Sequence, residues 1–193
     1  MSANPSSEGT RLVDGDLEDV RAAQVDRAAF GILYRRYLEP IYGYCFYLLG
    51  DHHDAEDATE RTFLAALGAI DRFRDEGATF RSWLFRIAHN QLVNALRTRD
   101  RHRTDPLDLV REPRGGGGDP SGLVTIADDA RRLRSAVGAL SEDRRQVVVL
   151  RFVDRLTARE IGVVLGRSEG AVRVLQHRAL RELATLLETT NSD

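Results

Sequence analysis

The sequence predicts an all-α protein, built as two small helical domains that are joined by a flexible linker. Apolar residues recur at helical spacing over most of the 193 residues, and no segment has the alternation expected of a strand. The pattern breaks between residues 104 and 129, which hold three prolines and a run of glycines. A packed unit on each side of such a stretch indicates two domains, and the C-terminal one carries a helix-turn-helix pattern.

Residues 1–25 are predicted to form an acidic, partly disordered N-terminal segment. They hold five acids and two arginines, although Leu17 and Val20 have the spacing of a helix that begins near residue 14. This segment has neither the basic start nor the apolar centre of a signal peptide. With no apolar run of 18 residues and a single cysteine, Cys45, we expect no membrane insertion, no intramolecular disulfide and a cytoplasmic location.

Residues 26–103 are predicted to form the first domain from three helices. The first helix, over residues 26–49, should end at Gly50, and Pro40 should kink or split it. The second, over residues 54–70, begins with acids that suit the positive end of the helix dipole. The third, over residues 80–99, follows a polar loop. The expected buried stripes are Phe30, Leu33, Tyr34, Tyr37, Ile41, Tyr44 and Leu48 on the first helix, Ala55, Ala58, Thr59, Thr62, Phe63, Ala66 and Ile70 on the second, and Leu84, Ile87, Ala88, Leu92 and Ala95 on the third.

Residues 104–129 read as the linker and residues 130–188 as the second domain. That domain should begin with a helix over residues 130–140, and Ser141 can cap the next helix. The packing residues of this second helix are expected to be Val147, Val148, Leu150 and Phe152.

The stretch from Leu156 to Leu183 predicts two short helices with a turn between them. Thr157 and Glu160 have the spacing of a capping box, Gly166 suits a left-handed helix end, and Ser168 can cap the second helix. A stripe at Val172, Leu175, Ala179 and Leu183 should be buried. The outward face then holds Gly170, Arg173, Val174, His177, Arg178 and Arg181.

Charge favours a nucleic-acid role for this helix pair over a purely structural one. Any small helical domain contains capped helix turns, so the geometry alone does not decide. From Ala130 to Leu183, however, there are twelve arginines against six acids, whereas the whole chain has a formal net charge of −2. Positive charge gathered beside a candidate reading helix is expected for phosphate contacts.

The outward face of the third helix offers a second candidate surface. Helical angles turn Ser82, Trp83, Arg86, His89, Asn90, Val93 and Arg97 away from its buried stripe. Aromatic rings stack on unpaired bases and arginines hold phosphates, so this face could bind a single strand. The alternative is that Trp83 lies at the edge of the core and that the arginines are a solvated face.

The acidic stretch from Asp51 to Asp57 could suggest a metal site, because histidine and carboxylates are metal ligands. Adjacent residues on a helix diverge by about 100°, so His52, His53 and Asp54 cannot converge on one ion. The acids read better as charges at a helix start or as a contact face for a basic partner. No metal or cofactor is therefore expected, and no phosphate loop or nucleophile motif is present.

Three motifs in this order resemble the extracytoplasmic-function sigma factors, the small two-domain members of the bacterial sigma-70 family. The resemblance covers residues 28–103 and 131–187. Its motifs are DHHDAEDATERTFLAAL, FRSWLFRIAHNQLVNALRTR and ALSEDRRQVVVLRFVDRLTAREIGVVLGRSEGAVRVLQHRALREL.

The resemblance implies a non-enzymatic subunit that binds core RNA polymerase and directs promoter recognition, promoter opening and transcription initiation. Docking on the clamp helices of the largest polymerase subunits would use Asp54, Glu56, Asp57 and Glu60. Capture and opening of the minus-10 promoter element would use Arg81, Trp83, Arg86, His89, Asn90 and Arg97. Reading of the minus-35 element would use Arg173, Val174 and His177 at base edges and Arg167, Ser168, Arg178 and Arg181 beside them.

The resemblance also implies a separate anti-sigma factor that covers these faces, and a linker that threads near the polymerase active centre. The family often has arginine at Leu175 and an apolar residue at Gln176, and here the two have exchanged character. Two alternatives from other classes are a stand-alone helix-turn-helix regulator, which would dimerise on a palindrome, and a metal-dependent enzyme built on the residues 52–57.

Overall fold

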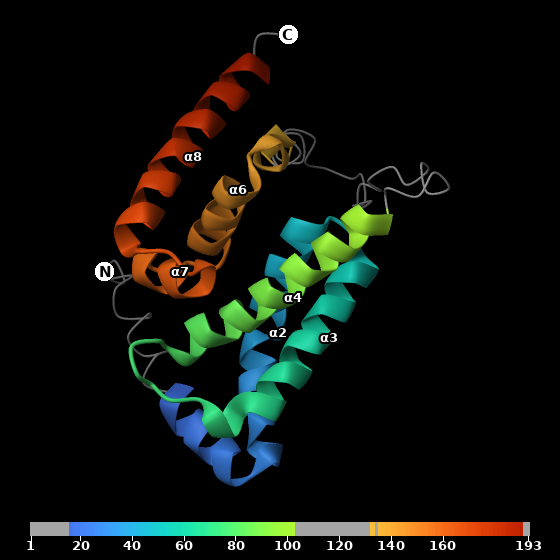
Figure 1. Cartoon of the computed structure of the whole chain (residues 1–193), viewed down its shortest axis with the longest axis vertical. Coiled ribbons are helices and arrows are strands. Elements are labelled where there is room, and N and C mark those ends of the chain that lie inside the picture. Colours follow the sequence, from blue (N-terminus) through green and yellow to red (C-terminus); the bar gives the residue numbers. More distant parts are fainter. Residues whose placement is uncertain (1–15, 103–131, 134, 191–193) are drawn as a thin grey trace, which may run out of the picture.

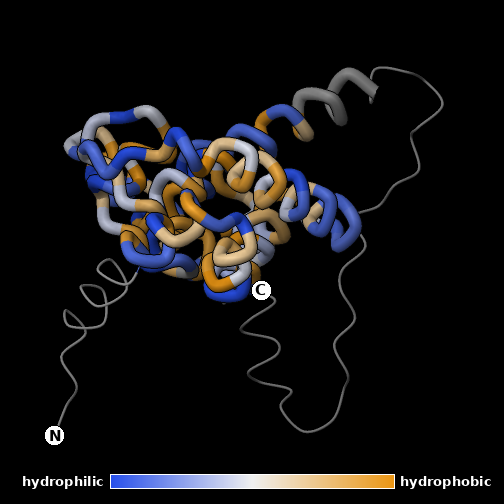
Figure 2. Tube along the Cα trace, turned by 90° about the horizontal axis from the view of Figure 1, so that it is seen from below, coloured by the Kyte–Doolittle hydropathy of each residue, from blue (hydrophilic) through white to orange (hydrophobic). Residues whose placement is uncertain are grey.

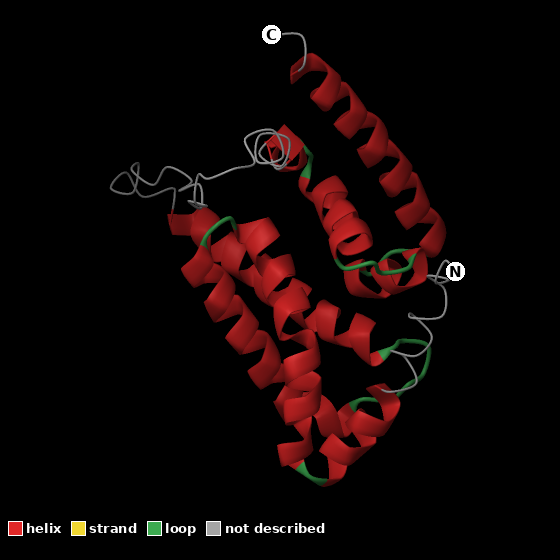
Figure 3. Ribbon diagram, turned by 180° about the vertical axis from the view of Figure 1, so that it is seen from behind, coloured by secondary structure: helices red, strands yellow, loops and turns green. Residues whose placement is uncertain are grey.

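The computed structural model describes residues 16–102, 132–133 and 135–190, and that part of the chain is helical with no strand (Figures 1 and 3). The linker expected over residues 104–129, the first ten residues and residues 191–193 lie outside the described part. None of the described helices is long and apolar enough to cross a membrane.

The N-terminal unit holds α2 (Phe30–Leu49), α3 (His52–Ala69) and α4 (Phe80–His102), with the short turn η1 (Arg27–Ala29) before α2 and the short turn η2 (Ile70–Arg72) after α3. The boundaries follow local chemistry. The Asp51 side chain accepts hydrogen bonds from the backbone of His53 and Asp54 and so begins α3. Gly50 ends α2 with φ 71°, in the left-handed region where a side chain is disfavoured. Pro40 lies inside α2, which runs on as one helix.

The predicted stripe of α3 is buried at all of its positions, and so is that of α2 apart from Tyr34. The prediction that Tyr34 is buried was wrong, because its side chain is 41% exposed. Its ring lies edge-on against Phe63 of α3 with the centroids 4.8 Å apart. Tyr34 therefore lines a groove between the two helices.

A further helix, at residues 16–25, packs on this unit. Val20 and Ala23 are buried in its core, and Gln24 donates hydrogen bonds to the backbone at η2. The helical spacing seen in the sequence is therefore real. The packed structure begins at least ten residues before the expected domain start at residue 26.

The C-terminal unit holds α6 (Glu142–Val148), the π-helical turn η3 (Val149–Val153), α7 (Ala158–Leu165) and α8 (Glu169–Thr190). Two expectations fail at its start. Ser141 stands at the cap position of α6 without making a side-chain cap hydrogen bond. Phe152 is 54% exposed, and the wide turn of η3 buries Val149 and Leu150 in the core instead.

The two units are packed against each other through one continuous core. Buried residues of η3, α7 and α8, such as Leu150, Ile161 and Val172, belong to the same hydrophobic cluster as Leu33 and Phe85 of the N-terminal unit. Figure 1 shows α7 beside the first half of α4, and in Figure 2 the hydrophobic residues along the trace of the helices are orange. A second, smaller cluster joins α6 to α8. The sequence pattern predicted two packed units but not this contact between them.

Candidate nucleic-acid interface

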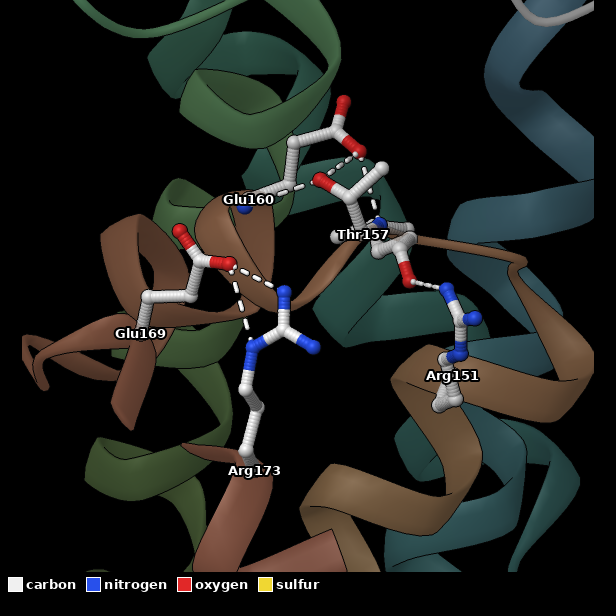
Figure 4. A network of polar contacts seen from close by, with 6 residues as sticks. Arg151, Thr157, Glu160, Glu169 and Arg173 are labelled. Atoms are coloured by element: carbon white, nitrogen blue, oxygen red, sulfur yellow. Dashed lines mark hydrogen bonds and ion pairs between the residues drawn. The ribbon is translucent and has the colours of Figure 1, made fainter. Parts of the chain in front are cut away.

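The helix-turn-helix is held by the caps that the sequence predicted. Thr157 Oγ1 accepts from the Glu160 amide at 3.2 Å, and the Glu160 carboxylate accepts from the Thr157 amide at 2.8 Å, which completes the capping box (Figure 4). Gly166 ends α7 with φ 64°, and Ser168 Oγ accepts from the Ala171 amide at 3.2 Å to begin α8. These bonds set the angle at which α8 leaves the turn.

The outward face of α8 lies in solvent as expected. Val172, Ala179 and Leu183 are buried, and Leu175 packs against the core from a partly buried position. All the residues predicted to point outward on this helix are exposed, namely Gly170, Arg173, Val174, His177, Arg178 and Arg181. The exposed face is a basic surface with one apolar side chain, Val174, at its centre. Such a surface fits a major groove, where arginines read base edges and phosphates.

Two of the basic residues make ion pairs within the chain. Arg173 donates to Glu169 Oε1 one turn earlier, at 2.6 and 3.2 Å (Figure 4). Arg167 donates to Asp143 Oδ2 at 2.6 Å. Both pairs are largely exposed. Exposed pairs contribute only about 0–1 kcal/mol, so phosphate or base contacts can replace them at little cost.

Gly162 is a feature of the turn that the helical pattern did not reveal. A Cβ atom at this position would lie 2.6 Å from the Arg167 carbonyl oxygen, which is backbone and cannot swing aside. The sequence signal was a glycine in the middle of a short amphipathic helix, where it costs about 1 kcal/mol relative to alanine unless packing requires it. The close approach lets α7 and the turn pack tightly.

The start of α4 presents part of its predicted single-strand surface to solvent. Arg86 and Asn90 are exposed, and Arg81 is partly buried. Trp83 is half-buried, and its ring packs against Phe73 at 5.2 Å and against Phe80 at 5.5 Å. Trp83 therefore lies at the edge of the core, as the structural interpretation expected, and still keeps part of its side chain accessible for a nucleic acid. Arg97 lies in α4, and its side chain is outside the described part.

One expectation for α4 was wrong and one buried residue was missed, because the helix is covered on a second side. Ser82, which was expected to point away from the core, is fully buried and donates to the Thr79 carbonyl at 2.9 Å. Phe85, which belonged to no predicted stripe, is also fully buried. Helix α7 of the C-terminal unit packs along α4, and the Phe85 ring lies edge-on against Tyr44 of α2 with the centroids 5.6 Å apart. Across this contact Thr79 Oγ1 donates to Glu160 Oε1 at 3.1 Å.

His89 is turned toward the same contact. Its Nδ1 lies 3.2 Å from the Tyr44 hydroxyl of α2. Burial lowers the pKa of His89, although the charges of Glu142 and Asp143 on α6 oppose this shift. The His89 side chain is therefore half-buried, whereas the side chains of Arg86 and Asn90 are exposed.

The acidic face of α3 is the third predicted contact surface. Its four predicted residues, Asp54, Glu56, Asp57 and Glu60, are exposed. Glu56 and Glu60 line a groove of about 520 Å³ between α2 and α3, together with the exposed apolar side chains of Tyr34, Leu38 and Leu64. The sequence pattern had identified the acids but not this apolar floor. In the described part of the chain no three histidine, cysteine or acidic residues are grouped to hold a metal ion.

Two family models match the chain, in the order of its two units. The model described as Sigma-70 region 2 matches residues 33–102, and the model described as Sigma-70, region 4 matches residues 136–185. These matches coincide with the unit that carries α4 and the unit that carries the helix-turn-helix.

Similar proteins carry the same family name. The ECF RNA polymerase sigma factor ShbA of Streptomyces griseus is 36% identical over 145 residues, which are 73% of this chain and 76% of that protein. The ECF RNA polymerase sigma factor BldN of Streptomyces coelicolor is 36% identical over 180 residues, which are 89% of this chain. The chain spans 65% of the length of BldN, less than two thirds.

Solved structures share the fold. CnrH, solved in complex with the cytosolic domain of CnrY, is 28% identical with a TM-score of 0.66, covering 90% of this chain and 97% of that one. The sigma factor RpoE of Bartonella quintana, solved with the anti-sigma factor NepR, is 23% identical with a TM-score of 0.70, covering 82% and 96%.

Proposed function

The chain belongs to the ECF sigma factors of the sigma-70 family, and from this membership we propose that it directs RNA polymerase to promoters and initiates transcription there. One observation carries the proposal. The region 2 and region 4 matches fall on two helical units that each expose predicted DNA-contact residues, Arg86 and Asn90 on α4 and the basic face of α8. A protein that contacts two promoter elements needs two such surfaces.

The basic face of α8 is the proposed reader of the minus-35 element. Arg173, Val174 and His177 lie in the first three turns of the helix, the part that reaches base edges when a recognition helix enters a major groove. Arg167, Ser168, Arg178 and Arg181 flank them and would contact phosphates. These contacts carry no sequence information but set the register on the duplex.

The proposed minus-10 surface is the face of α4 that holds Arg81, Trp83, Arg86, His89, Asn90 and Arg97. The accessible part of the Trp83 ring would stack on an unpaired base, and Arg86 would hold the backbone beside it. Helix α7 of the C-terminal unit packs along α4 and Ser82 is buried, so separation of the two units would expose more of α4. We propose that promoter binding uses this open arrangement.

Core polymerase is the proposed occupant of the groove between α2 and α3. The groove combines an apolar floor with Glu56 and Glu60 on its rim, and Asp54 and Asp57 extend the negative charge along α3. This composition suits a basic helical partner, because an apolar centre supplies affinity and rim charges supply orientation. The clamp helices of the largest polymerase subunits are the partner that the family implies.

We further propose that a separate anti-sigma factor regulates this chain, that the chain works in the cytoplasm and that it is not itself an enzyme. RpoE was solved with an anti-sigma factor, NepR. A partner that holds α7 against α4 would keep the two units in this packed arrangement. No observation favours the stand-alone regulator or the metal-dependent enzyme.

Run-off transcription with purified core polymerase tests the proposal. Promoters are first selected from a randomised duplex library by the reconstituted holoenzyme, and we expect initiation from a fixed position that depends on the added chain. Absence of selected sequences and of directed initiation would overturn the proposal. Tight binding of the chain alone to a palindrome, without affinity for core polymerase, would instead support the stand-alone regulator.

A charge-reversal pair tests the docking assignment. Glu56→Arg should weaken binding to core polymerase, while Glu18→Arg, on the exposed side of the helix at residues 16–25, should leave it unchanged. Both side chains are exposed, so neither change should disturb the fold. Equal polymerase affinity of the two variants would contradict the docking assignment.

A further inference from the structure

The helix at residues 16–25 lies beside the segment that leads into α4. In Figure 1 this helix and the start of α2 lie next to η2, from which the loop runs to the beginning of α4. Its own side chains Val20 and Ala23 are buried, so it is a packed part of the N-terminal unit. Its two ends are fixed to different parts of the unit.

One end is fixed to α2 by a polar cluster. Asp16 is only 3% exposed, and its carboxylate accepts from the Tyr37 hydroxyl and from Arg36 Nη1, the latter at 2.5 Å. The same guanidinium donates to Asp19 Oδ2 at 2.6 Å. Charge-assisted bonds of this kind are stronger than neutral ones, and burial shields them from solvent. The cluster therefore holds the helix in one position on α2.

The other end is fixed to the turn before α4. Gln24 Nε2 donates to the Ile70 carbonyl at 3.0 Å and to the Phe73 carbonyl at 3.2 Å. These two carbonyls bracket η2, so one side-chain amide ties the beginning of the turn to its end. The Phe73 ring then lies 5.2 Å from Trp83 and 5.7 Å from Phe80. A direct line of contacts therefore leads from Gln24 to the tryptophan.

We propose that the helix at residues 16–25 is a strap that positions the aromatic layer of Phe73, Phe80 and Trp83 for promoter opening, with Gln24 as the positioning residue. The inference rests on the proposed function, since it concerns how the minus-10 surface is held. A ring captures an unpaired base only if its orientation is set in advance, because misplacement by about 1 Å can cost on the order of a hundredfold. Gln24 acts through the Phe73 backbone and touches no DNA.

The test uses Gln24→Met in the full chain assembled with core polymerase. Methionine keeps the length of the side chain and removes both donors. We expect a library-selected duplex promoter to open about tenfold more slowly, because the variant loses the two hydrogen bonds that position Phe73. Permanganate reactivity of the minus-10 thymines measures the rate of opening. On a template that is already unpaired across the minus-10 element, initiation should return to the wild-type level. Gln24→Lys, which can still donate to the carbonyls, should open the duplex faster than Gln24→Met.

Glu18→Gln is the matched control, because it lies exposed on the same helix, and it should behave as wild type. Two results would overturn the inference. One is wild-type opening by Gln24→Met, and the other is an equal loss on duplex and unpaired templates, which would indicate general damage. Failure of the proposed function is a separate result, since the wild-type holoenzyme would then initiate on neither template.

Discussion

Replacement of Asp154 by asparagine should stabilise the protein, and more so as the pH rises. Asp154 follows η3 and is 3% exposed. Its Oδ2 atom has no hydrogen-bond partner within the described residues. Burial raises the pKa of this carboxyl to about 8, although the charge of Arg81 pulls it down. Burial raises the pKa values of Tyr44 and Cys45 on α2, and a negative charge on Asp154 adds to both shifts, so the carboxyl lies near α2, where the two units meet.

The size of the effect follows from the difference between the two pKa values. In the unfolded chain the carboxyl ionises near its ordinary value of 3.8, whereas in the folded chain it stays protonated to about pH 8. Below pH 4 both states are protonated and no penalty arises. Between pH 4 and pH 8 the free energy of unfolding falls by about 1.4 kcal/mol per pH unit. Above pH 8 the accumulated decrease is roughly 5 kcal/mol. That is a large part of the typical stability of a domain, about 5–15 kcal/mol.

Denaturant unfolding of the wild type and of Asp154→Asn at several pH values between 5 and 9 measures this difference. Asparagine has nearly the same shape and no charge, so its gain over wild type should grow from about 1–2 kcal/mol at pH 5 to roughly 5 kcal/mol above pH 8. Asp143→Asn, at an exposed acid paired with Arg167, should show a small and nearly constant effect. A gain from Asp154→Asn that stays constant with pH would refute the reasoning.

Three further predictions concern the C-terminal unit. Gly162→Ala should lower the free energy of unfolding by about 1–3 kcal/mol in denaturant titration, because the new Cβ would meet the Arg167 carbonyl. The control Gly170→Ala has open space around the new Cβ and should raise the free energy of unfolding by up to about 1 kcal/mol. Arg155→Gly should raise the thermal midpoint, because Arg155 has φ 55° and only glycine adopts this region without cost; an unchanged or lower midpoint would contradict this. Arg173→Ala should weaken minus-35 binding by about 1–3 kcal/mol and relax the base preference at one position. Competition among promoters that differ at single bases measures this effect. An equal loss of affinity on all of these promoters would make Arg173 a phosphate contact only.

Helix α3 and the helix-turn-helix show how much the sequence determined. Every predicted stripe position of α3 is buried, and the bonds of Thr157, Glu160 and Ser168 form as their spacing indicated. The outward face of α8 is exposed at each residue that helical angles selected. These features depend on residues no more than one or two turns apart, so the local pattern contains nearly all of the information.

Helix α4 shows what only the tertiary structure decided. A helical projection assumes a single buried side, but α4 is buried against both α2–α3 and α7. Ser82 and Phe85 are therefore buried, and His89 is half-covered. The bond between Thr79 and Glu160 crosses 81 positions of sequence, a separation that no periodicity can report. The sequence alone thus determined the helices, their caps and the basic face of α8, because short-range hydrogen bonds and side-chain spacing control them. Which faces remain open to DNA was decided by the packing of the two units, because burial depends on contacts between segments far apart in the chain.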